Sequence, residues 1–238
     1  MTLACWARVA DVTVAQALMC IGYTINNNFF ELQSANGGPL AYEDNAGVAV
    51  QAQATAAPTN NTWFHAAATF TSTTSRAAFL NGTNKGTDAT LLATPAVDTT
   101  TIGCEFATGT PQVFTNGDIA EAAVWNITLS DTNVAELARG MSPMLVRPDA
   151  LVAYWPLWGT ITTEPDRFVG AFHLTGFNTP TQATQHPPTM IYPSRPNIYR
   201  TSPAPPAPPS PLTAPVLPLS TQWLLHRIDL KPRREEHS

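Results

Sequence analysis

The feature that most constrains this chain is a series of short apolar or alternating stretches, each ended by turn-forming residues. At the N-terminus, the apolar residues Leu3, Cys5, Ala7 and Val9 occupy every second position. A period of two is typical of strands with one buried face. Comparable stretches occupy residues 18–23, 29–33, 48–54, 63–70, 76–80, 101–106 and 119–127. Many short strands with frequent turns predict a β-sandwich or a β-barrel.

Asparagine and glycine mark the turns between these stretches. The pair Asn81–Gly82 directly follows an apolar run, and both residue types tolerate the positive φ of a tight hairpin turn. The segments 36–39 and 116–117 are predicted to be turns for the same reason. A single segment has the character of a helix. Ser130 suits the N-cap of a helix over residues 131–139, and Gly140 suits the left-handed position that follows a helix.

Composition narrows the class further. Only 12% of the 238 residues are charged, about half the usual share of roughly 25%, which argues against a disordered chain or a coiled coil. No apolar run approaches the ~18 to 20 residues of a membrane helix, and no basic segment follows Met1. We therefore expect a soluble protein that does not enter a membrane and is made without a cleaved secretion signal. Cys5, Cys20 and Cys104 lie in apolar stretches without metal-ligand spacing, so we expect free buried thiols, with one disulfide as the alternative.

Charge and proline divide the chain at the same place. Residues 1–187 carry six basic and fourteen acidic side chains, whereas residues 188–238 carry six basic and three acidic ones. An acidic body lacks the positive charge that neutralises phosphates, so we expect no nucleic-acid binding. Thirteen of the 22 prolines follow His186, with the densest run at 202–211. Such a run favours an extended polyproline spacer over a packed core.

An apolar and basic cluster lies beyond this spacer and is predicted to anchor the protein to a partner. Its members are Trp223, Leu224, Leu225, Arg227, Ile228 and Leu230. A short apolar segment at the end of a spacer has no core of its own to join, so we expect it to dock on another surface. The alternative is a disordered terminus.

Three segments together resemble the laminin-G-like domain, a concanavalin-A-type jelly roll. They are residues 61–82 (Asn-Thr-Trp-Phe-His to Phe-Leu-Asn-Gly), residues 117–130 (Gly-Asp-Ile-Ala-Glu to Leu-Ser) and residues 151–157 (Leu-Val-Ala-Tyr-Trp-Pro-Leu). The resemblance implies an all-β, antiparallel jelly-roll sandwich over residues 1–188 with one short helix. Residues 189–238 would form an extended Pro-rich C-terminal tail.

The order of these segments departs from the family pattern. The 151–157 segment commonly opens such a domain, whereas here it comes last, so the chain resembles a circularly permuted sandwich. We therefore expect 151–157 to pair with 119–127 in one antiparallel sheet. The permuted form is similar to domains of bacteriophage structural proteins. This resemblance implies a non-enzymatic virion protein, a capsid decoration or tail-associated component assembled in the host cytoplasm. It would bind other virion proteins through its tail, and a homo-oligomer is a further expectation.

Catalysis is not expected. Glucanases of this fold carry two glutamates that face the same side of a strand at about 5 to 5.5 Å. The nearest candidates here are Asp118 and Glu121, whose spacing places them on opposite faces of a regular strand. Asp118 is predicted to be a turn residue and Glu121 a polar strand residue. His65 and His173 lie in strand-like segments, where a structural role is the default, so no catalytic residue is predicted.

Sugar binding is the alternative function. Relatives of the fold bind glycans through aromatic residues or through a Ca²⁺ ion held by oxygen ligands in rim loops. The predicted loop 42–45 offers such oxygens, but the usual acidic residue of the 117–121 stretch is Ala120 here. We therefore expect no metal or other cofactor, with Ca²⁺ as the alternative. Trp63, Trp125 and Trp155 lie in apolar strands and are assigned to the core. Trp158, in a turn after a proline, is the candidate for an exposed carbohydrate-binding residue.

Overall fold

The computed structural model describes residues 1–158, 162–187 and 190–193. Within this part, strands form two large antiparallel sheets, as predicted for a jelly-roll sandwich. The five-stranded sheet contains, in spatial order, β5 (Val48–Gln53), β4 (Gly38–Asn45), β3 (Asn28–Ala35), β2 (Gln16–Gly22) and β9 (Thr99–Ile102). The six-stranded sheet contains β13 (Leu151–Trp155), β12 (Gly117–Trp125), β1 (Thr2–Val9), β6 (Phe64–Ser72), β7 (Ser75–Leu80) and β8 (Asn84–Asp88).

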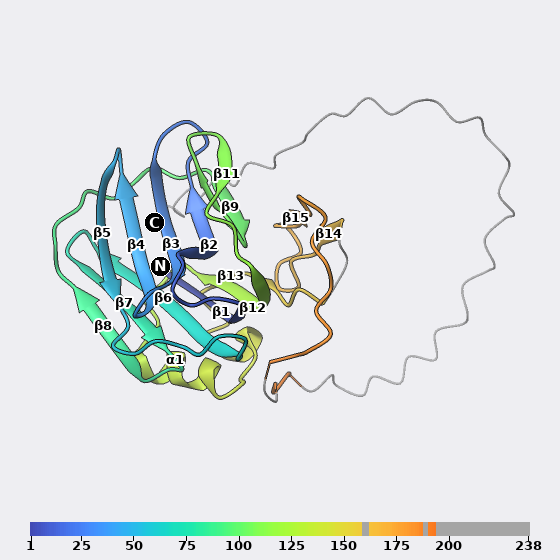
Figure 1. Cartoon of the computed structure of the whole chain (residues 1–238). Helices are drawn as coiled ribbons and strands as arrows, with labels where there is room; N and C mark the ends of the chain where they lie inside the picture. Colours follow the sequence, from blue (N-terminus) through green and yellow to red (C-terminus); the bar gives the residue numbers. More distant parts are fainter. Residues whose placement is uncertain (159–161, 188–189, 194–238) are drawn as a thin grey trace, which may run out of the picture. The chain divides into compact units, whose positions relative to one another are not determined.

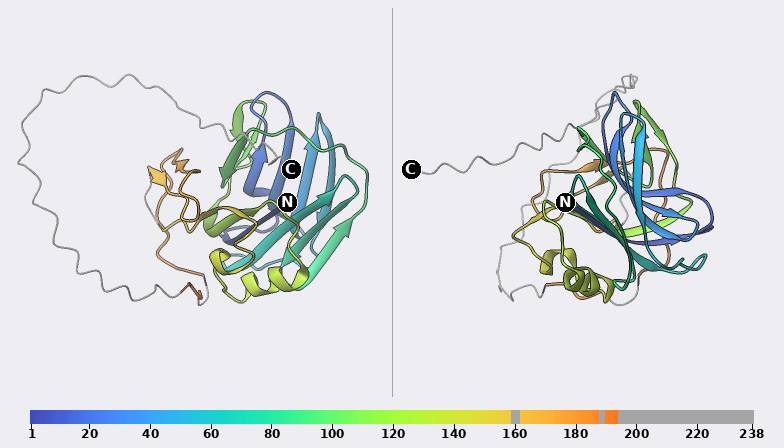
Figure 2. Two further views of the ribbon diagram at one scale, coloured as in Figure 1. Left: turned by 180° about the vertical axis from the view of Figure 1, so that it is seen from behind. Right: turned by 90° about the vertical axis from the view of Figure 1, so that its left-hand side faces the viewer.

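The apolar core lies between the two sheets. Alternate residues of β1, among them Leu3 and Cys5, face alternate residues of β3 such as Leu32 in one buried cluster. The outer face of the six-stranded sheet is also buried, because helix α1 (Asp131–Ala138) packs on it through Val134 and Leu137. The sheets and the helix therefore form three layers, which the two further views show from behind and edge-on (Figure 2).

Helix α1 begins at the predicted residue and ends one residue earlier than predicted, with Arg139 as its C-cap. The Ser130 side chain accepts a hydrogen bond from the amide of Asn133, and Gly140 has a φ of 93°. After the 3-10 turn η1 (Pro143–Leu145), strand β13 pairs antiparallel with β12, so that Ala153 lies opposite Val124. The predicted pairing of these two segments is confirmed, and α1 lies in the connection between them (Figure 1).

Two short hairpins accompany the sheets. Strands β10 (Glu105–Ala107) and β11 (Thr110–Gln112) pair with each other and lie beside β2 and β9. Strands β14 (Thr163–Glu164) and β15 (Leu174–Thr175) form a two-residue ladder after β13. The hairpin predicted at Asn81–Gly82 is confirmed: both residues have positive φ, and β7 pairs with β8 across them.

The structure corrects three sequence assignments of the strands. The turn predicted at 36–39 ends earlier, because Gly38 and Pro39 already belong to β4 and pair with β3. The single strand predicted over 101–106 is divided into β9 and β10 by Gly103, whose φ of 80° breaks the extended backbone. Strand β8 carries no apolar alternation, since its sequence is Asn-Lys-Gly-Thr-Asp, and it was therefore not predicted.

All three cysteines are free, as expected, although Cys104 is only half-buried. No helix of the described residues is long and apolar enough to cross a membrane. The predicted anchor residues, Trp223, Leu224, Leu225, Arg227, Ile228 and Leu230, lie outside the described residues, as does most of the predicted tail.

Candidate functional site

Strand β12 contains a bulge at Glu121. In the register with β1, Ala4 pairs with Ala123 and Trp6 pairs with Ala120, so Glu121 and its neighbour together face one residue of β1. Glu121 has a φ of 56°, a conformation that is uncommon for residues other than glycine. Such bulges redirect a side chain. Here the bulge turns the Glu121 side chain to the outer face of the sheet, where it lies beside Trp6 in a small cavity.

The Glu121 carboxylate is buried and fully engaged by hydroxyl donors. Tyr154 donates its hydroxyl to Oε2 over 2.5 Å, and Tyr192 donates its hydroxyl to Oε1 over 2.8 Å. Burial raises the pKa of Glu121 above its usual range, while hydrogen bonds from Tyr154, Tyr192 and Trp158 oppose that rise. The Glu121 carboxylate therefore hydrogen-bonds both the core residue Tyr154 of β13 and two aromatic residues that follow β13, Trp158 and Tyr192.

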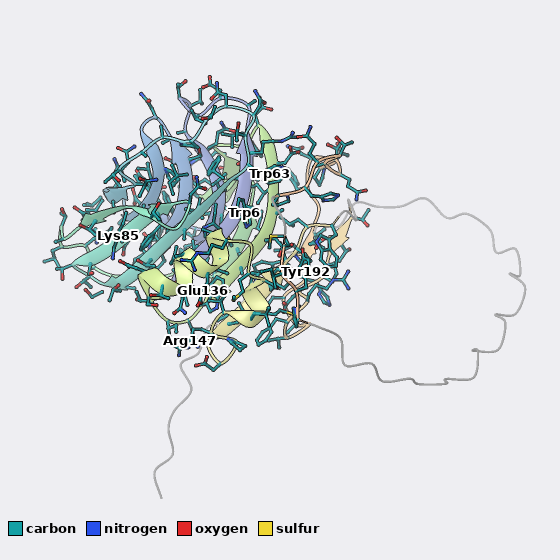
Figure 3. All side chains as sticks on the ribbon, turned by 90° about the horizontal axis from the view of Figure 1, so that it is seen from below. Trp6, Trp63, Lys85, Glu136, Arg147 and Tyr192 are labelled. Atoms are coloured by element: carbon teal, nitrogen blue, oxygen red, sulfur yellow. The ribbon has the colours of Figure 1, made fainter. Side chains whose placement is uncertain are left out.

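Trp158 and Tyr192 form an exposed aromatic pair. Their ring centroids lie 5.6 Å apart, edge to face, and the two residues are 53% and 38% exposed. In a view from below, Tyr192 is labelled on the side of the sandwich away from Lys85 (Figure 3). Because Glu121 is buried beneath both residues and hydrogen-bonded to them, the rings are held in place while part of each ring surface stays open to solvent. We call Trp158 and Tyr192 the aromatic pair.

The backbone beside Tyr192 is fixed independently. The amide of Ile191 donates to the carbonyl of Gly140 over 2.7 Å, and the amide of Ser142 donates to the carbonyl of Ile191 over 2.9 Å. These bonds form a parallel bridge between Ile191 and Met141, just after helix α1. The position of Tyr192 is therefore set by backbone bonds as well as by its hydroxyl.

A cavity of about 10 Å³ lies under this site, comparable to the space of one water molecule. Glu121, Trp6, Met190 and His65 line it. His65 is buried, and its Nδ1 has no hydrogen-bond partner among the described residues. Burial lowers the pKa of His65 to about 3, so its imidazole is neutral at physiological pH. The cavity is too small for a sugar, so only the exposed aromatic pair offers a contact surface here.

The assignment of Asp118 and Glu121 was wrong in two respects. Asp118 is a residue of β12, not of a turn, and accepts a hydrogen bond from Arg8 Nε over 2.7 Å. The bulge interrupts the alternation of side chains after Ala120. Glu121 therefore lies on the same face of the sheet as Asp118, not on the opposite face. Both carboxylates are occupied, Asp118 by an ion pair and Glu121 by tyrosine hydroxyls.

The proposed Ca²⁺ loop at residues 42–45 is also corrected. These residues form the end of strand β4, and Glu43 points into the core, where it pairs with Arg76. Asp44 is buried and accepts a hydrogen bond from the amide of Gly47 in the following turn. Within residues 1–158, 162–187 and 190–193, no group of three or more His, Cys, Asp or Glu side chains is arranged to hold a metal ion.

The tryptophans divide largely as expected. Trp125 and Trp155 are buried, and each indole donates to a backbone carbonyl. Trp158 is exposed, as the turn position predicted. Trp63 was assigned to the core, but it precedes the first residue of β6 and is half-buried under the Arg8 guanidinium, 5.9 Å from the ring centroid. The sequence did not reveal Tyr192 as a site residue, because its contact with Glu121 spans 71 positions.

Comparison with known proteins assigns the chain to a protein superfamily. The described fold is a lectin-like β-sandwich, and residues 1–135 match the family model of the concanavalin A-like lectin/glucanases superfamily. The chain belongs to this superfamily. No curated protein matches the sequence.

The chain is also similar to solved structures, at low sequence identity. The CBM40 module of the Ruminococcus gnavus IT-sialidase is 19% identical, with a TM-score of 0.50, 58% of this chain covered and 81% of the module covered. A heptameric SAP-like pentraxin from Limulus polyphemus is 13% identical (TM-score 0.47), with 58% of this chain and 68% of the pentraxin covered. Domain 4 of an arabinanase from Geobacillus stearothermophilus is 17% identical (TM-score 0.43), with 58% and 65% covered.

Proposed function

We propose that the protein is a non-enzymatic glycan-binding sandwich and that the aromatic pair is its sugar-contacting surface. The observation that carries this proposal is the fixed, exposed pair of Trp158 and Tyr192 above the buried Glu121. Large aromatic rings offer contact area at a low cost in conformational entropy, and their faces attract the polarised C–H groups of a sugar ring. The membership of the superfamily and the likeness to a module named CBM40 support the same class of ligand.

The engagement of the nearby carboxylates supports the absence of catalysis. Hydrolysis of a glycosidic bond needs an acid and a nucleophile or base that reach the substrate. Asp118 is ion-paired with Arg8, and Glu121 is 4% exposed with both oxygens hydrogen-bonded. The Glu121 carboxylate, which lies beneath the aromatic pair, therefore has no free oxygen directed to solvent. We therefore expect no turnover of laminarin, agarose or similar polymers.

A glycan array probed with the full chain tests the proposal. The Trp158→Ala variant should lose at least about tenfold in affinity for the glycans that bind, because exposed aromatic anchors commonly contribute more than 1.4 kcal/mol. The matched control is Phe114→Ala, since Phe114 is a 49% exposed aromatic residue in the loop between β11 and β12. Equal binding by wild type and Trp158→Ala would overturn the assignment of the site, and an array without any binder would overturn the function.

A second proposal concerns where the sandwich is displayed. We propose that the protein is a virion component, held on the particle by residues 189–238. The supporting observation is the division of the sequence into an acidic body and a basic, Pro-rich tail with an apolar cluster around Trp223. Opposite charge on a partner would speed association, and a buried tryptophan is a common interface anchor.

Deletion of residues 201–238 tests this second proposal. The truncated protein should keep the far-UV spectrum of a β-fold and should no longer sediment with particles. Trp223→Ala should weaken the association without changing the melting temperature of the body. Normal particle binding by the truncated protein would show that any attachment is made by the sandwich.

A further inference from the structure

The outer face of the five-stranded sheet carries a polar row. The register of the strands places Glu31 of β3 opposite Cys20 of β2 and Tyr42 of β4. Thr101 of β9 and Gln51 of β5 extend the same row to the two edges. Phe30 and Leu32, the neighbours of Glu31 in sequence, belong to the core cluster, so the row faces away from the core.

The β10–β11 hairpin covers the middle of this row. A Cβ atom on Gly22 would lie 2.4 Å from the Phe106 carbonyl oxygen, so the hairpin backbone crosses β2 where a side chain is absent. Ala107 of the hairpin packs with Cys20 and Phe29 in a small apolar cluster. Cys20 and Glu31 are both fully buried as a result. The hairpin therefore acts as a cover over residues that a bare sheet face would expose.

Two carboxyl groups meet beneath this cover. Glu31 accepts a hydrogen bond from Gln33 at Oε1, and Glu105 accepts one from Gln112 over 2.5 Å. Oε2 of Glu31 is buried and receives no donor from any of the described residues. Glu105 is also buried, and its strand β10 contacts β3, so the two carboxyl groups lie within reach of each other. Because ionised carboxylates only accept hydrogen bonds, a bond between Glu31 and Glu105 requires a proton on one of them.

The groups around the pair do not supply positive charge. The negative charge of the two glutamates raises the pKa of three neighbouring groups, which are Cys20 of β2, Cys104 of the β9–β10 turn and Tyr42 of β4. The charge of Asp44 also raises the pKa of Tyr42. All these neighbours are acids. Burial and the like charge of Glu105 raise the pKa of Glu31 well above its usual range.

We propose that Glu31 and Glu105 form a proton-dependent latch that holds the β10–β11 hairpin over the outer face of the five-stranded sheet. While they share a proton, the pair forms a hydrogen bond between β3 and β10. When both are ionised, two like charges lie together in a buried site, and the hairpin separates from the sheet. The separation would uncover Cys20, Glu31 and the centre of the polar row.

The direction of the pH effect follows from the closed state binding its proton more tightly. In the open state Glu31 is solvated and has an ordinary pKa of about 4.3. Proton binding by Glu31 therefore stabilises the closed state in full at pH values below this ordinary pKa. The stabilisation is lost as the pH rises through the raised pKa of the closed state. Acid closes the latch and alkali opens it.

Cys20 offers a direct readout, since its thiol is buried under the hairpin, whereas the Cys5 thiol is buried in the core between the sheets. Modification of the full chain by a methanethiosulfonate reagent, followed by peptide mass spectrometry, measures both thiols at once. Each rate is divided by the rate in the urea-unfolded chain at the same pH, which removes the intrinsic pH dependence of thiol reactivity. The protection of Cys20 should fall at least tenfold from pH 6 to pH 9, while the protection of Cys5 stays within twofold.

The Glu31→Gln variant should keep Cys20 protected equally at both pH values, because the amide donates to Glu105 without a titratable proton. Glu105→Gln should do the same and serves if Glu31→Gln does not fold. Glu136→Gln, on helix α1, is the matched control and should retain the wild-type pH dependence. The proposal is overturned if Cys20 protection does not depend on pH, if Cys5 loses protection in parallel, or if both glutamine variants keep the wild-type response.

Discussion

Arg76 of β7 and Glu43 of β4 form an ion pair across the interior of the sandwich, with 3.1 Å between Nε and Oε2. The Arg76 side chain is completely buried, and its other nitrogens bind Asp88 and the backbone carbonyls of Thr90 and Thr73. One guanidinium thus joins the two sheets and the loop that follows β8. Since every nitrogen has a partner, this charge is compensated despite its burial.

Removal of either partner of this ion pair should be costly. Arg76→Met would leave the Glu43 carboxylate buried without its cation, and we expect a loss of about 3 to 5 kcal/mol in the free energy of unfolding. Urea denaturation measures the loss. The exposed pair of Arg147 and Asp149 provides the control, because Arg147→Met removes only a solvent-screened ion pair and should leave the stability nearly unchanged. Similar effects of both substitutions would contradict a structural role for Arg76.

Glu121 should influence stability in a pH-dependent way. Burial raises its pKa, so the folded state holds the Glu121 proton more tightly than the unfolded state. The contribution of protonated Glu121 to the free energy of unfolding is largest below the ordinary glutamate pKa of about 4.3. It is lost as pH rises through the raised pKa of the folded state. The Glu121→Gln variant lacks this titration. The stability of the wild type relative to Glu121→Gln should therefore fall as pH rises from 4 to 8, as measured by urea denaturation at each pH.

His65 should remain neutral in the folded protein well below the usual histidine range. Burial lowers its pKa to about 3, so folding disfavours the charged imidazolium. The stability that depends on neutral His65 is present above an ordinary pKa of about 6.5 and is lost as pH falls toward 3. Imidazole NMR signals of the folded chain should show His65 neutral at pH 5. A midpoint near 6.5 would mean that the ring is solvated.

Gly22 should be required for the close approach of the hairpin. In Gly22→Ala the new methyl group would meet the Phe106 carbonyl oxygen at 2.4 Å, so the hairpin must move away from the sheet. We expect faster thiol modification of Cys20 at every pH. In the control Gly47→Ala, the added Cβ meets no atom within 4 Å, and only backbone strain at φ 85° remains. Unchanged Cys20 protection in Gly22→Ala would contradict the described packing.

The sequence predicted those parts of the fold that depend on local patterns. Apolar alternation located β1, turn chemistry located the Asn81–Gly82 hairpin, and Ser130 located the start of α1. Strand β8 was missed because its residues lie at a sheet edge and carry no apolar pattern. Residues 42–45, the end of β4, were interpreted as a loop because Glu43 is compensated by a distant arginine, Arg76, which local spacing does not reveal.

The candidate site was predicted only in part for the same reason. Trp158 follows a proline in a turn, and this local signal correctly indicated exposure. The orientation of Glu121 depends on a bulge that is defined by pairing with β1, more than 100 residues away in the sequence. Tyr192 reaches the site because its neighbour Ile191 forms backbone hydrogen bonds with Gly140 and Ser142. Neither relationship has a sequence pattern of its own.

The most direct test of glycan binding at the aromatic pair is an NMR titration of the indole N–H signals. The chain has six tryptophans, and Trp158→Phe assigns the signal of Trp158 by its disappearance. Addition of a glycan selected on the array should shift the Trp158 signal with a saturable dependence, while the buried Trp125 and Trp155 signals stay in place. Saturable binding that leaves the Trp158 signal unchanged would contradict the account.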